Sequence, residues 1–342
     1  MEKLSTKKVA AVLRCLIEGN SVASTTRITG TSKPCILKIL REAGEACSEY
    51  QDEHLRNLPS KTLQLDEIWS FVGCKEGNKD NAVGEHPGDV WTWTAICSDT
   101  KIIPSWRVGD RSGNTAYDFC KDLAKRFNGH LQITSDGHSA YRYAVTNHFL
   151  QMDFAQLVKL YGKDAKGMDV VTGIKKVKVL GQPDMDLVST SYVERSNLTV
   201  RMMNRRFTRK TNAFSKKVEN HCYMLAIGFM NYNFCRVHQS IKTTPAVAAG
   251  VSDKVWSMQD VAEMVVAHHA AKLEAEFEAA FSIPKFTAPR TYKAQEPSEK
   301  LLPWYLDPES GGPSPSMEDR KPGIRYQDGF TGHIPMIGNE FP

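Results

Sequence analysis

Three acidic residues stand out because their types and surroundings could support metal-dependent chemistry. Asp66 lies inside a run of strand-forming residues, where propensity disfavours aspartate. Asp136 comes just after the strand-like segment 131–135, and Glu194 stands at the head of a basic stretch. Carboxylate oxygens are the ligands that hard divalent cations prefer, so these acids together could hold one or two Mg²⁺ ions. Paired Mg²⁺ ions activate an attacking oxygen and stabilise a leaving one, which predicts phosphodiester chemistry.

Each acid also has a structural alternative. Asp136 and Gly137 form an ordinary turn pair, and Glu194 could simply cap a helix or pair with its neighbours. In the first strand, Glu67 could be the important acid instead of Asp66. Because side chains alternate across a strand, we expect only one of these two neighbours to enter a given site.

The stretch that follows Glu194 is strongly basic. From Arg195 to Lys217 there are eight lysines and arginines and no aspartate or glutamate. A solvated helix face usually interleaves both charge signs. The stretch therefore favours a surface that holds nucleic-acid phosphates over a simply solvated helix face.

The segments that must position the three acids show an α/β pattern. The expected elements are strands in 62–75, 90–97 and 101–109, a helix in 113–127 and a short strand in 131–135. Three strands, a helix and a fourth strand that ends in an acid predict an α/β domain. Strand ends and adjoining helix N-termini converge at one rim of a parallel-type sheet, which would bring the acids together. Further helices are expected from about 191, in 215–235 and in 257–280. The region 155–188 gives no clear pattern, and its segment GIKKVKVLG is either a strand or a basic loop.

Residues 5–50 show an all-helical pattern. Apolar residues at helical spacing predict a first helix that ends at Gly19, a second helix over 22–29 and a third that begins at Ser32. Two short helices, a glycine turn and a third helix are typical of a helix-turn-helix DNA-binding domain. The exposed side of the third helix would carry Ser32, Lys33, Lys38 and Arg41. The alternative is a plain three-helix bundle that serves dimerisation.

The composition of the 342-residue chain excludes several classes of protein. The net charge is only +5, so a nucleic-acid function must depend on local clusters. The eight cysteines form no CxxC pair, which excludes a zinc ribbon and favours free thiols in a reducing cytoplasm. We expect no signal peptide, because Arg14 interrupts the N-terminal apolar run and no cleavage-site pattern follows it. We expect no membrane span, because no apolar run approaches 18 residues.

The segments LDEIWSFVGCK, TSDGHSAY and YVERSNLTVRMMNRRFTRKTNAFSKKVENH closely resemble the DDE transposases of the insertion-sequence-one family. The resemblance runs from about Leu63 to Val251, with weak matching over 142–186, and its last motif is long and specific. It implies an RNase H-like fold in which Asp66, Asp136 and Glu194 form the catalytic and metal-binding triad. The cofactor it implies is Mg²⁺ or Mn²⁺, as two ions.

The resemblance also implies a function. Such a transposase binds insertion-element ends and catalyses DNA strand cleavage and strand transfer without a covalent protein–DNA intermediate. The family has a basic residue seven positions after its glutamate, and Arg201 stands there. The expected DNA-contacting residues in and after this motif are Asn197, Arg201, Arg205, Arg206, Arg209 and Lys210. His221 is a further candidate, with a satisfied core histidine as its alternative.

The expected architecture joins these predictions. It consists of a helix-turn-helix domain at 1–50, a linker at 51–61, an RNase H-like α/β catalytic domain at 62–250, a C-terminal helix at 251–283 and a mostly disordered, proline-rich tail at 284–342. The expected partners are double-stranded DNA and further copies of the chain on DNA, with no membrane and no small-molecule substrate. The expected location is the bacterial cytoplasm, in association with the nucleoid.

Three other functions compete with this prediction. A non-catalytic helix-turn-helix regulator derived from a transposase would bind DNA without metal. A recombinase that uses Tyr141 or Tyr192 as nucleophile would form a protein–DNA adduct and act in EDTA. A general RNase H-like nuclease shares the chemistry, but it has no need of the N-terminal helices.

Overall fold

The computed structural model describes residues 5–81, 87–164, 167–208 and 211–281. A compact unit extends as far as Phe277. The predicted tail at 284–342 lies outside the described residues. Among the helices that are described, none has the length and apolar character needed to cross a membrane.

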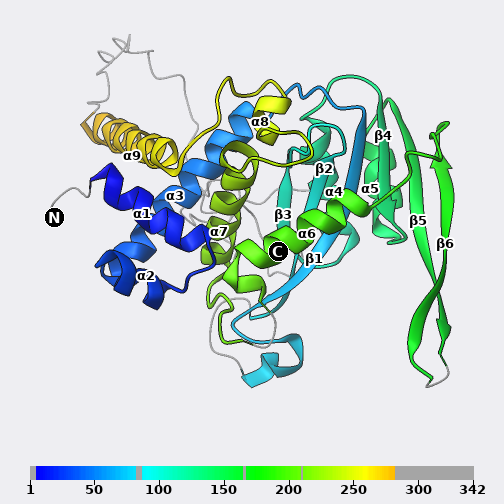
Figure 1. Ribbon diagram of the computed structural model, residues 1–342, viewed down its shortest axis with the longest axis horizontal. Coiled ribbons are helices and arrows are strands. Elements are labelled where there is room, and N and C mark those ends of the chain that lie inside the picture. The colour runs from blue at the N-terminus through cyan, green and yellow to red at the C-terminus, as the bar shows by residue number, and fades with distance from the viewer. Residues whose placement is uncertain (1–4, 82–86, 165–166, 209–210, 282–342) are drawn as a thin grey trace, which may run out of the picture. The chain divides into compact units, whose positions relative to one another are not determined.

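A mixed sheet forms the centre of this unit (Figure 1). Its strands are β1 Thr62–Val72, β2 Gly88–Cys97, β3 Trp106–Gly109, β4 Leu131–Asp136, β5 Met152–Lys163 and β6 Asp169–Leu180. They lie in the order β3-β2-β1-β4-β5-β6. The pairs β1–β4 and β4–β5 are parallel, whereas the other neighbours are antiparallel. The parallel centre gives β1 and β4 a common direction, so their carboxyl ends meet at one edge.

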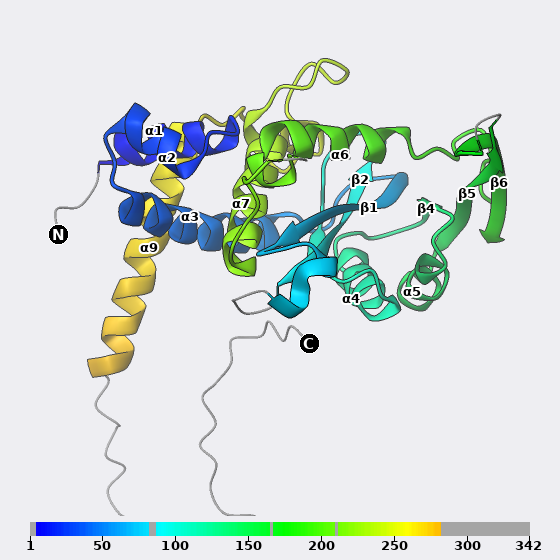
Figure 2. The same ribbon diagram turned by 90° about the horizontal axis from the view of Figure 1, so that it is seen from below.

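Helices cover both faces of the sheet. The helices are α1 Thr6–Ile17, α2 Val22–Thr29, α3 Lys33–His54, α4 Gly113–Ala124, α5 Ala140–His148, α6 Ser191–Met203, α7 Val218–Met230, α8 Pro245–Ala248 and α9 Met258–Phe281. Shorter helical turns occur at Glu76–Asn81, Arg205–Phe207 and Asn231–Cys235. Figure 2 shows α6 on one face of the sheet and α4 and α5 on the other. The α/β fold class is therefore confirmed.

The N-terminal helices begin and end where their sequence predicts. The Ser5 and Ser21 hydroxyls accept hydrogen bonds from backbone N–H groups in the first turns of α1 and α2. Gly30 ends α2 with φ +65°, a left-handed conformation that costs glycine little. The third helix, however, continues through His54. The first residues of the expected linker, 51–54, are therefore helical.

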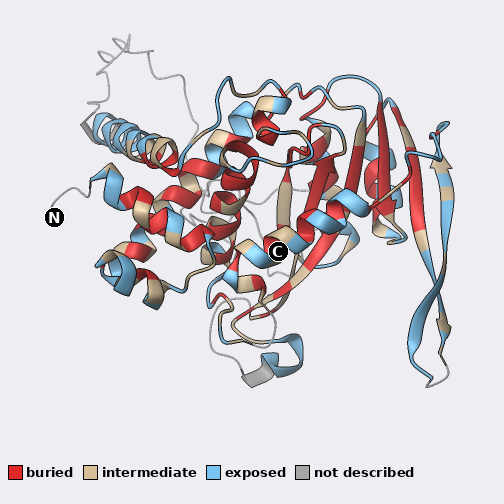
Figure 3. Ribbon diagram, in the orientation of Figure 1, coloured by how far each residue is buried: buried red, intermediate tan, exposed pale blue. Residues whose placement is uncertain are grey.

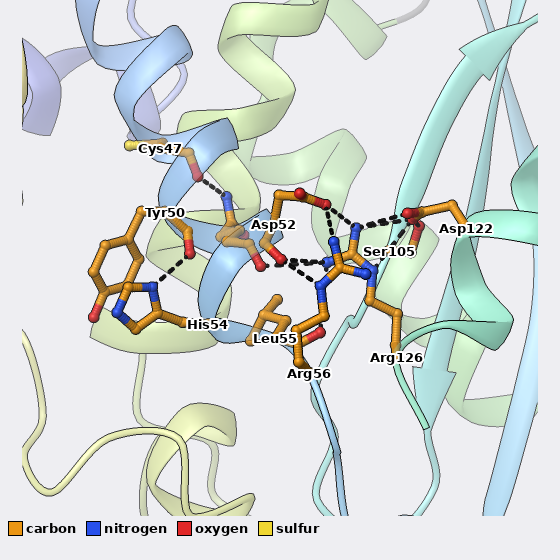
Figure 4. Close-up of polar contacts among 10 residues, drawn as sticks. Cys47, Tyr50, Asp52, His54, Leu55, Arg56, Ser105, Asp122 and Arg126 are labelled. Carbon is orange, nitrogen blue, oxygen red and sulfur yellow. Dashed lines mark hydrogen bonds and ion pairs between the residues drawn. The ribbon is translucent and has the colours of Figure 1, made fainter. Parts of the chain in front are cut away.

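A buried arginine explains why α3 runs on into the α/β part. Arg126, just after α4, donates hydrogen bonds to the Asp52 and Asp122 carboxylates and to backbone carbonyls near the end of α3 (Figure 4). Its guanidinium lies 2.7 Å from Asp52 Oδ1 and 2.9 Å from Asp122 Oδ2. On the same helix, Gln51 donates to the Ala226 carbonyl of α7 at 3.0 Å. These contacts require an ordered helix where the start of a linker was expected.

Some expected strands and helices have different bounds in the structure. The segment 101–105 is not a strand, because Lys101 adopts a left-handed turn and Pro104 lacks a backbone N–H. The region 155–188, which gave no clear pattern, contains the end of β5 and all of β6. The expected helix at 215–235 starts at Val218 and ends in a π-type turn. The helix α5 was not predicted.

The sheet separates two apolar clusters. Ile68, Val193 and Phe229 belong to the cluster beneath α6 and α7. Trp93 and Phe119 belong to the larger cluster on the other face, which continues into the N-terminal helices. Alternation along β1 therefore directs even-numbered side chains towards α6 and odd-numbered ones towards α4 and α5.

Candidate active site

The strands β1 and β4 bring two of the predicted acids together. Leu65 pairs with Ser135 in the parallel register, so the next residues, Asp66 and Asp136, lie side by side. Each offers a carboxylate oxygen to a group whose oxygens all lie within 4.8 Å of one another. The backbone N–H of His138 donates to Asp136 Oδ1 at 3.0 Å, which orients that carboxylate at the strand end.

Glu67 supplies the third carboxylate of this group. Its side chain is 2% exposed and accepts hydrogen bonds from the Arg111 guanidinium at 2.8 Å and the Tyr141 hydroxyl at 2.9 Å. The prediction that only one of the two adjacent acids can enter a given site is therefore wrong. The two side chains do contact partners on different faces, but Asp136 ends its strand within reach of both carboxylates. The position of Glu67 next to Asp66 in the sequence was the signal that could have predicted its place in this group.

Electrostatic repulsion and burial dominate this group of carboxylates. Desolvation, followed by the charges of Glu67 and Asp136, raises the pKa of Asp66 to about 7. Desolvation and the Asp136 charge also raise the pKa of Glu67, although Arg111 opposes the shift. The site thus has too little positive charge for its carboxylates. A hard divalent cation would relieve this deficit, so the donor set fits Mg²⁺ or Mn²⁺.

The third predicted acid, Glu194, lies on the helix side of the site. It stands in the first turn of α6, where a negative charge is favourable. Its Oε1 accepts from Lys159 Nζ at 2.9 Å and from the Thr190 hydroxyl at 3.1 Å. Glu194 is not in the three-carboxylate group found among the described residues, yet it is near enough for its charge to help raise the Asp66 pKa.

Two amide side chains attach α6 to the sheet. Gln64 Oε1 accepts from the backbone N–H groups of Tyr192 and Val193 at 2.8 and 3.1 Å, and so caps the N-terminus of α6 from β1. One turn after Glu194, Asn197 Nδ2 donates to Asp66 Oδ2 at 2.8 Å. The predicted DNA-contacting residue Asn197 is therefore buried and bonded to a carboxylate of the site. Neither Gln64 nor Lys159 was predicted.

The predicted DNA-contacting residues occupy several environments. At the start of α3 and along it, the exposed members are Ser32, which precedes the helix, and Lys33, Lys38 and Arg41. After α6, Arg205 is exposed, whereas desolvation lowers the pKa of the partly covered Arg206 to about 10. Arg201 is partly covered, and Arg209 and Lys210 lie outside the described residues.

His221 is a buried core residue, as its structural alternative predicted. It is fully buried, and its ring nitrogens lie 3.3 Å from the Ser70 hydroxyl and 3.4 Å from the Ser215 hydroxyl. Desolvation lowers its pKa to about 3, so it is neutral at ordinary pH. It links β1 to α7 and is not available to DNA.

Comparisons with known proteins add one partial sequence match. No protein-family model matches the chain. The chain is similar to the insertion element iso-IS1n protein InsB of Shigella dysenteriae, with 27% identity over 158 residues, 46% of this chain and 86% of that protein.

Two solved structures of transposase complexes also align with the chain. The piggyBac transposase synaptic complex with hairpin DNA has a TM-score of 0.36 and 11% identity, and the alignment covers 94% of this chain and 80% of that one. The Drosophila P element transposase strand transfer complex has a TM-score of 0.29 and 9% identity, with 83% and 82% covered. TM-scores of this size do not establish a shared fold.

Proposed function

We propose that this chain is a DDE-type transposase, which cleaves the ends of an insertion element and transfers the strands to target DNA. The observation that carries the proposal is the joint position of Asp66 and Asp136 at the centre of the sheet beneath Glu194. The motifs around these residues resemble the DDE transposases of the insertion-sequence-one family. The partial similarity to an insertion-element protein supports the same function.

The topology supports the proposal that the α/β part is RNase H-like. In the order β3-β2-β1-β4-β5, the neighbours β3, β2 and β1 are antiparallel, and β4 and β5 run parallel to β1. The acids lie on β1 and β4. This is the order expected of an RNase H-like fold with its first acid on the central strand. The sixth strand is an addition at the edge of the sheet.

We assign Asp66, Asp136 and Glu194 as the metal-holding residues. When bound there, two Mg²⁺ or Mn²⁺ ions would activate the attacking oxygen and stabilise the leaving oxygen in phosphodiester chemistry. Asn197 fixes the Asp66 carboxylate through its hydrogen bond, and the α6 N-terminus adds a favourable positive potential. Glu194 can join the strand carboxylates by releasing Lys159, since an exposed ion pair is weak.

DNA contacts are proposed on two surfaces. The exposed side of α3, within the helix-turn-helix domain at 1–50, would bind the element ends. Basic residues of and after α6 would hold phosphates next to the acids; these are Arg201, Arg205, Arg206, Arg209 and Lys210. The linker, catalytic domain and C-terminal helix proposed at 51–61, 62–250 and 251–283 complete this organisation, with copies of the chain assembling on DNA. A cytoplasmic, nucleoid-associated location follows from this function and stays a prediction.

The competing functions fit the site less well. Tyr141 is fully buried and donates its hydroxyl to Glu67, so it is not placed to attack DNA. Tyr192 is more exposed, but Lys101 Nζ lies 3.3 Å from the centre of its ring. A non-catalytic regulator is not favoured, because it has no use for three carboxylates forced together at the centre of a sheet.

Cleavage of a labelled duplex that carries the element's terminal repeat tests the proposed function. The purified chain is expected to cleave in Mg²⁺ and not in EDTA. Glu194→Gln is expected to bind the duplex without cleaving it. The matched control Glu274→Gln changes an exposed acid on α9 and should cleave normally. Cleavage in EDTA, or a covalent protein–DNA adduct, would overturn the assignment.

A further inference from the structure

The β5–β6 hairpin extends beyond the rest of the sheet. We call its described residues 158–164 and 167–178 the β-arm. Figure 3 shows buried residues at the root of β5 and exposed ones along the outer halves of both strands. The exposed large apolar side chains of the β-arm are Leu160, Tyr161, Met168, Val170, Val171 and Ile174. A two-stranded ribbon is only marginally stable by itself in water, so this much exposed apolar surface indicates a binding partner.

The lysines of the β-arm are unevenly distributed between its two faces. Lys159 pairs with Ile174, and Lys176 pairs with Leu157, so both lysines share the face that meets Glu194. Alternation along β5 adds Tyr161 and Lys163 to this face. Lys178, which pairs with Ala155, extends it towards the root. We call this surface the Lys159 face.

The opposite face of the β-arm is poorer in charge. Lys175 pairs with Val158 there, beside Leu160 and its partner Gly173. The described part of the β-arm contains only two acids, Asp164 and Asp169. Lys163 Nζ contacts Asp169 at 2.7 Å, but both side chains are more than half exposed, so a phosphate can readily replace this partner.

Charge identifies the class of partner. If a second copy paired along the free edge of β6, it would bring two lysine-rich strands together, and like charges on facing strands are destabilising. A polyphosphate backbone instead complements the Lys159 face. Lys159 also connects this face directly to the candidate active site, so a duplex entering the site would continue along it.

We propose that the Lys159 face of the β-arm binds the backbone of double-stranded DNA next to the cleavage point. This inference rests on the proposed function, since it assigns a path to the DNA that the active site would cut. Lys163 and Lys176 contact phosphates, and Tyr161 lies between the basic residues against the sugars.

Photo-crosslinking tests the position of the DNA. A benzophenone amino acid replaces Tyr161 in one variant and Tyr143 on α5 in the control; both tyrosines are 66% exposed. Each variant is irradiated with a fluorescent duplex of about 30 base pairs, roughly three helical turns. A protein–DNA adduct is expected from position 161 and not from position 143.

The outcomes separate this inference from the proposed function. If the unsubstituted chain does not bind the duplex at all, both the proposed function and the β-arm assignment are overturned. Duplex binding without an adduct at position 161 would overturn the β-arm assignment alone. A protein–protein adduct at position 161 would assign the β-arm to a second copy of the chain.

The salt dependence of duplex binding tests which face of the β-arm contacts the DNA phosphates. Lys163→Gln should lower the slope of log Kobs against log[salt] by about 0.9, the contribution of one phosphate contact. Lys175→Gln makes the same change of charge on the opposite face and should leave the slope nearly unchanged. Equal slopes for the two variants would overturn the assignment to the Lys159 face.

Discussion

The strand side and the helix side of the candidate active site are held in different ways. On the strand side, Asp66, Glu67 and Asp136 project from neighbouring strands at the centre of the sheet, and the Glu67 side chain is 2% exposed. On the helix side, the Glu194 side chain is 47% exposed and bound to Lys159. The fold fixes the strand side, whereas Glu194 can exchange its partner at little cost.

This difference suggests separate roles for the strand carboxylates and for Glu194 in binding a metal ion. The fold holds the strand carboxylates close together, so they repel one another. A bound cation would reduce this repulsion. Under the proposed function, Glu194 would join the metal by giving up its present partner, the Lys159 ammonium group. We therefore expect changes on the strand side to affect both chemistry and stability, and changes on the helix side to affect chemistry alone.

The largest expected effect comes from the strand acids. Asp66→Asn or Asp136→Asn should reduce strand cleavage by about a thousandfold or more, the scale on which a preorganised charge contributes to catalysis. Binding of duplex DNA should stay close to normal, because the predicted DNA-contacting residues are unchanged. Gel assays of cleavage and binding check both results. Cleavage by either variant at the normal rate would remove that residue from the site.

The pH dependence of stability should reveal the repulsion at Asp66. Its pKa rises from the ordinary 3.8 to about 7 on folding, so the folded chain holds a proton that the unfolded chain loses over this range. Without metal, the free energy of unfolding should therefore fall as pH rises from about 4 to about 7. Urea unfolding in EDTA should show a shallower fall for Asp66→Asn. Mg²⁺ should stabilise the unsubstituted chain more at pH 8 than at pH 5; an equal gain would contradict a shared metal site.

Paired alanine substitutions compare the two sides by stability. Glu67→Ala should lower the free energy of unfolding by about 2 kcal/mol, because the buried Tyr141 hydroxyl loses its acceptor. Glu194→Ala should change it by no more than about 0.5 kcal/mol, since the ion pair that it forms with Lys159 is exposed to water. Urea unfolding in EDTA measures both values. A similar loss in the two variants would mean that the helix side is as firmly held as the strand side.

The smallest expected effect belongs to Lys159. Lys159→Gln removes the ammonium group that competes for Glu194, so Mn²⁺ should bind more tightly, by at most about fivefold. Calorimetric titration without DNA measures this directly. Lys121→Gln, on α4 at the other face of the sheet, is the matched control and should leave the affinity unchanged. Weaker Mn²⁺ binding by Lys159→Gln would show that Lys159 supports the metal site instead of competing with it.

Local signals predicted much of the fold. Ser5, Ser21 and Gly30 mark helix ends by side-chain capping and by a left-handed turn, which depend on neighbours in the sequence. The continuation of α3 through residues 51–54 was not predictable in this way. It depends on contacts with Arg126 and Ala226, both distant in the sequence. Strand β5 was not predicted because it lies between β4 and β6, where its first half is buried on both faces. Its sequence therefore lacks the simple alternation of apolar and polar residues.

The candidate site was also predicted only in part, because some of its contacts join residues that are distant in the sequence. Asp66 and Asp136 could be paired from the expected end of β4 beside β1, and the structure places them together. Strand alternation led us to expect only one of Asp66 and Glu67 in the site, but this rule does not describe a residue at the end of the neighbouring strand, and Asp136 lies near both. Lys159 belongs to a segment without a clear pattern, so its bond to Glu194 could only be found in three dimensions.

The most direct test of the central claim is an anomalous difference map from crystals grown with Mn²⁺. We predict anomalous density between the Asp66 and Asp136 carboxylates, with Glu194 turned away from Lys159 towards the metal. Absence of density there, or a metal-bound site in which Glu194 still contacts Lys159, would contradict the joint role of the three acids.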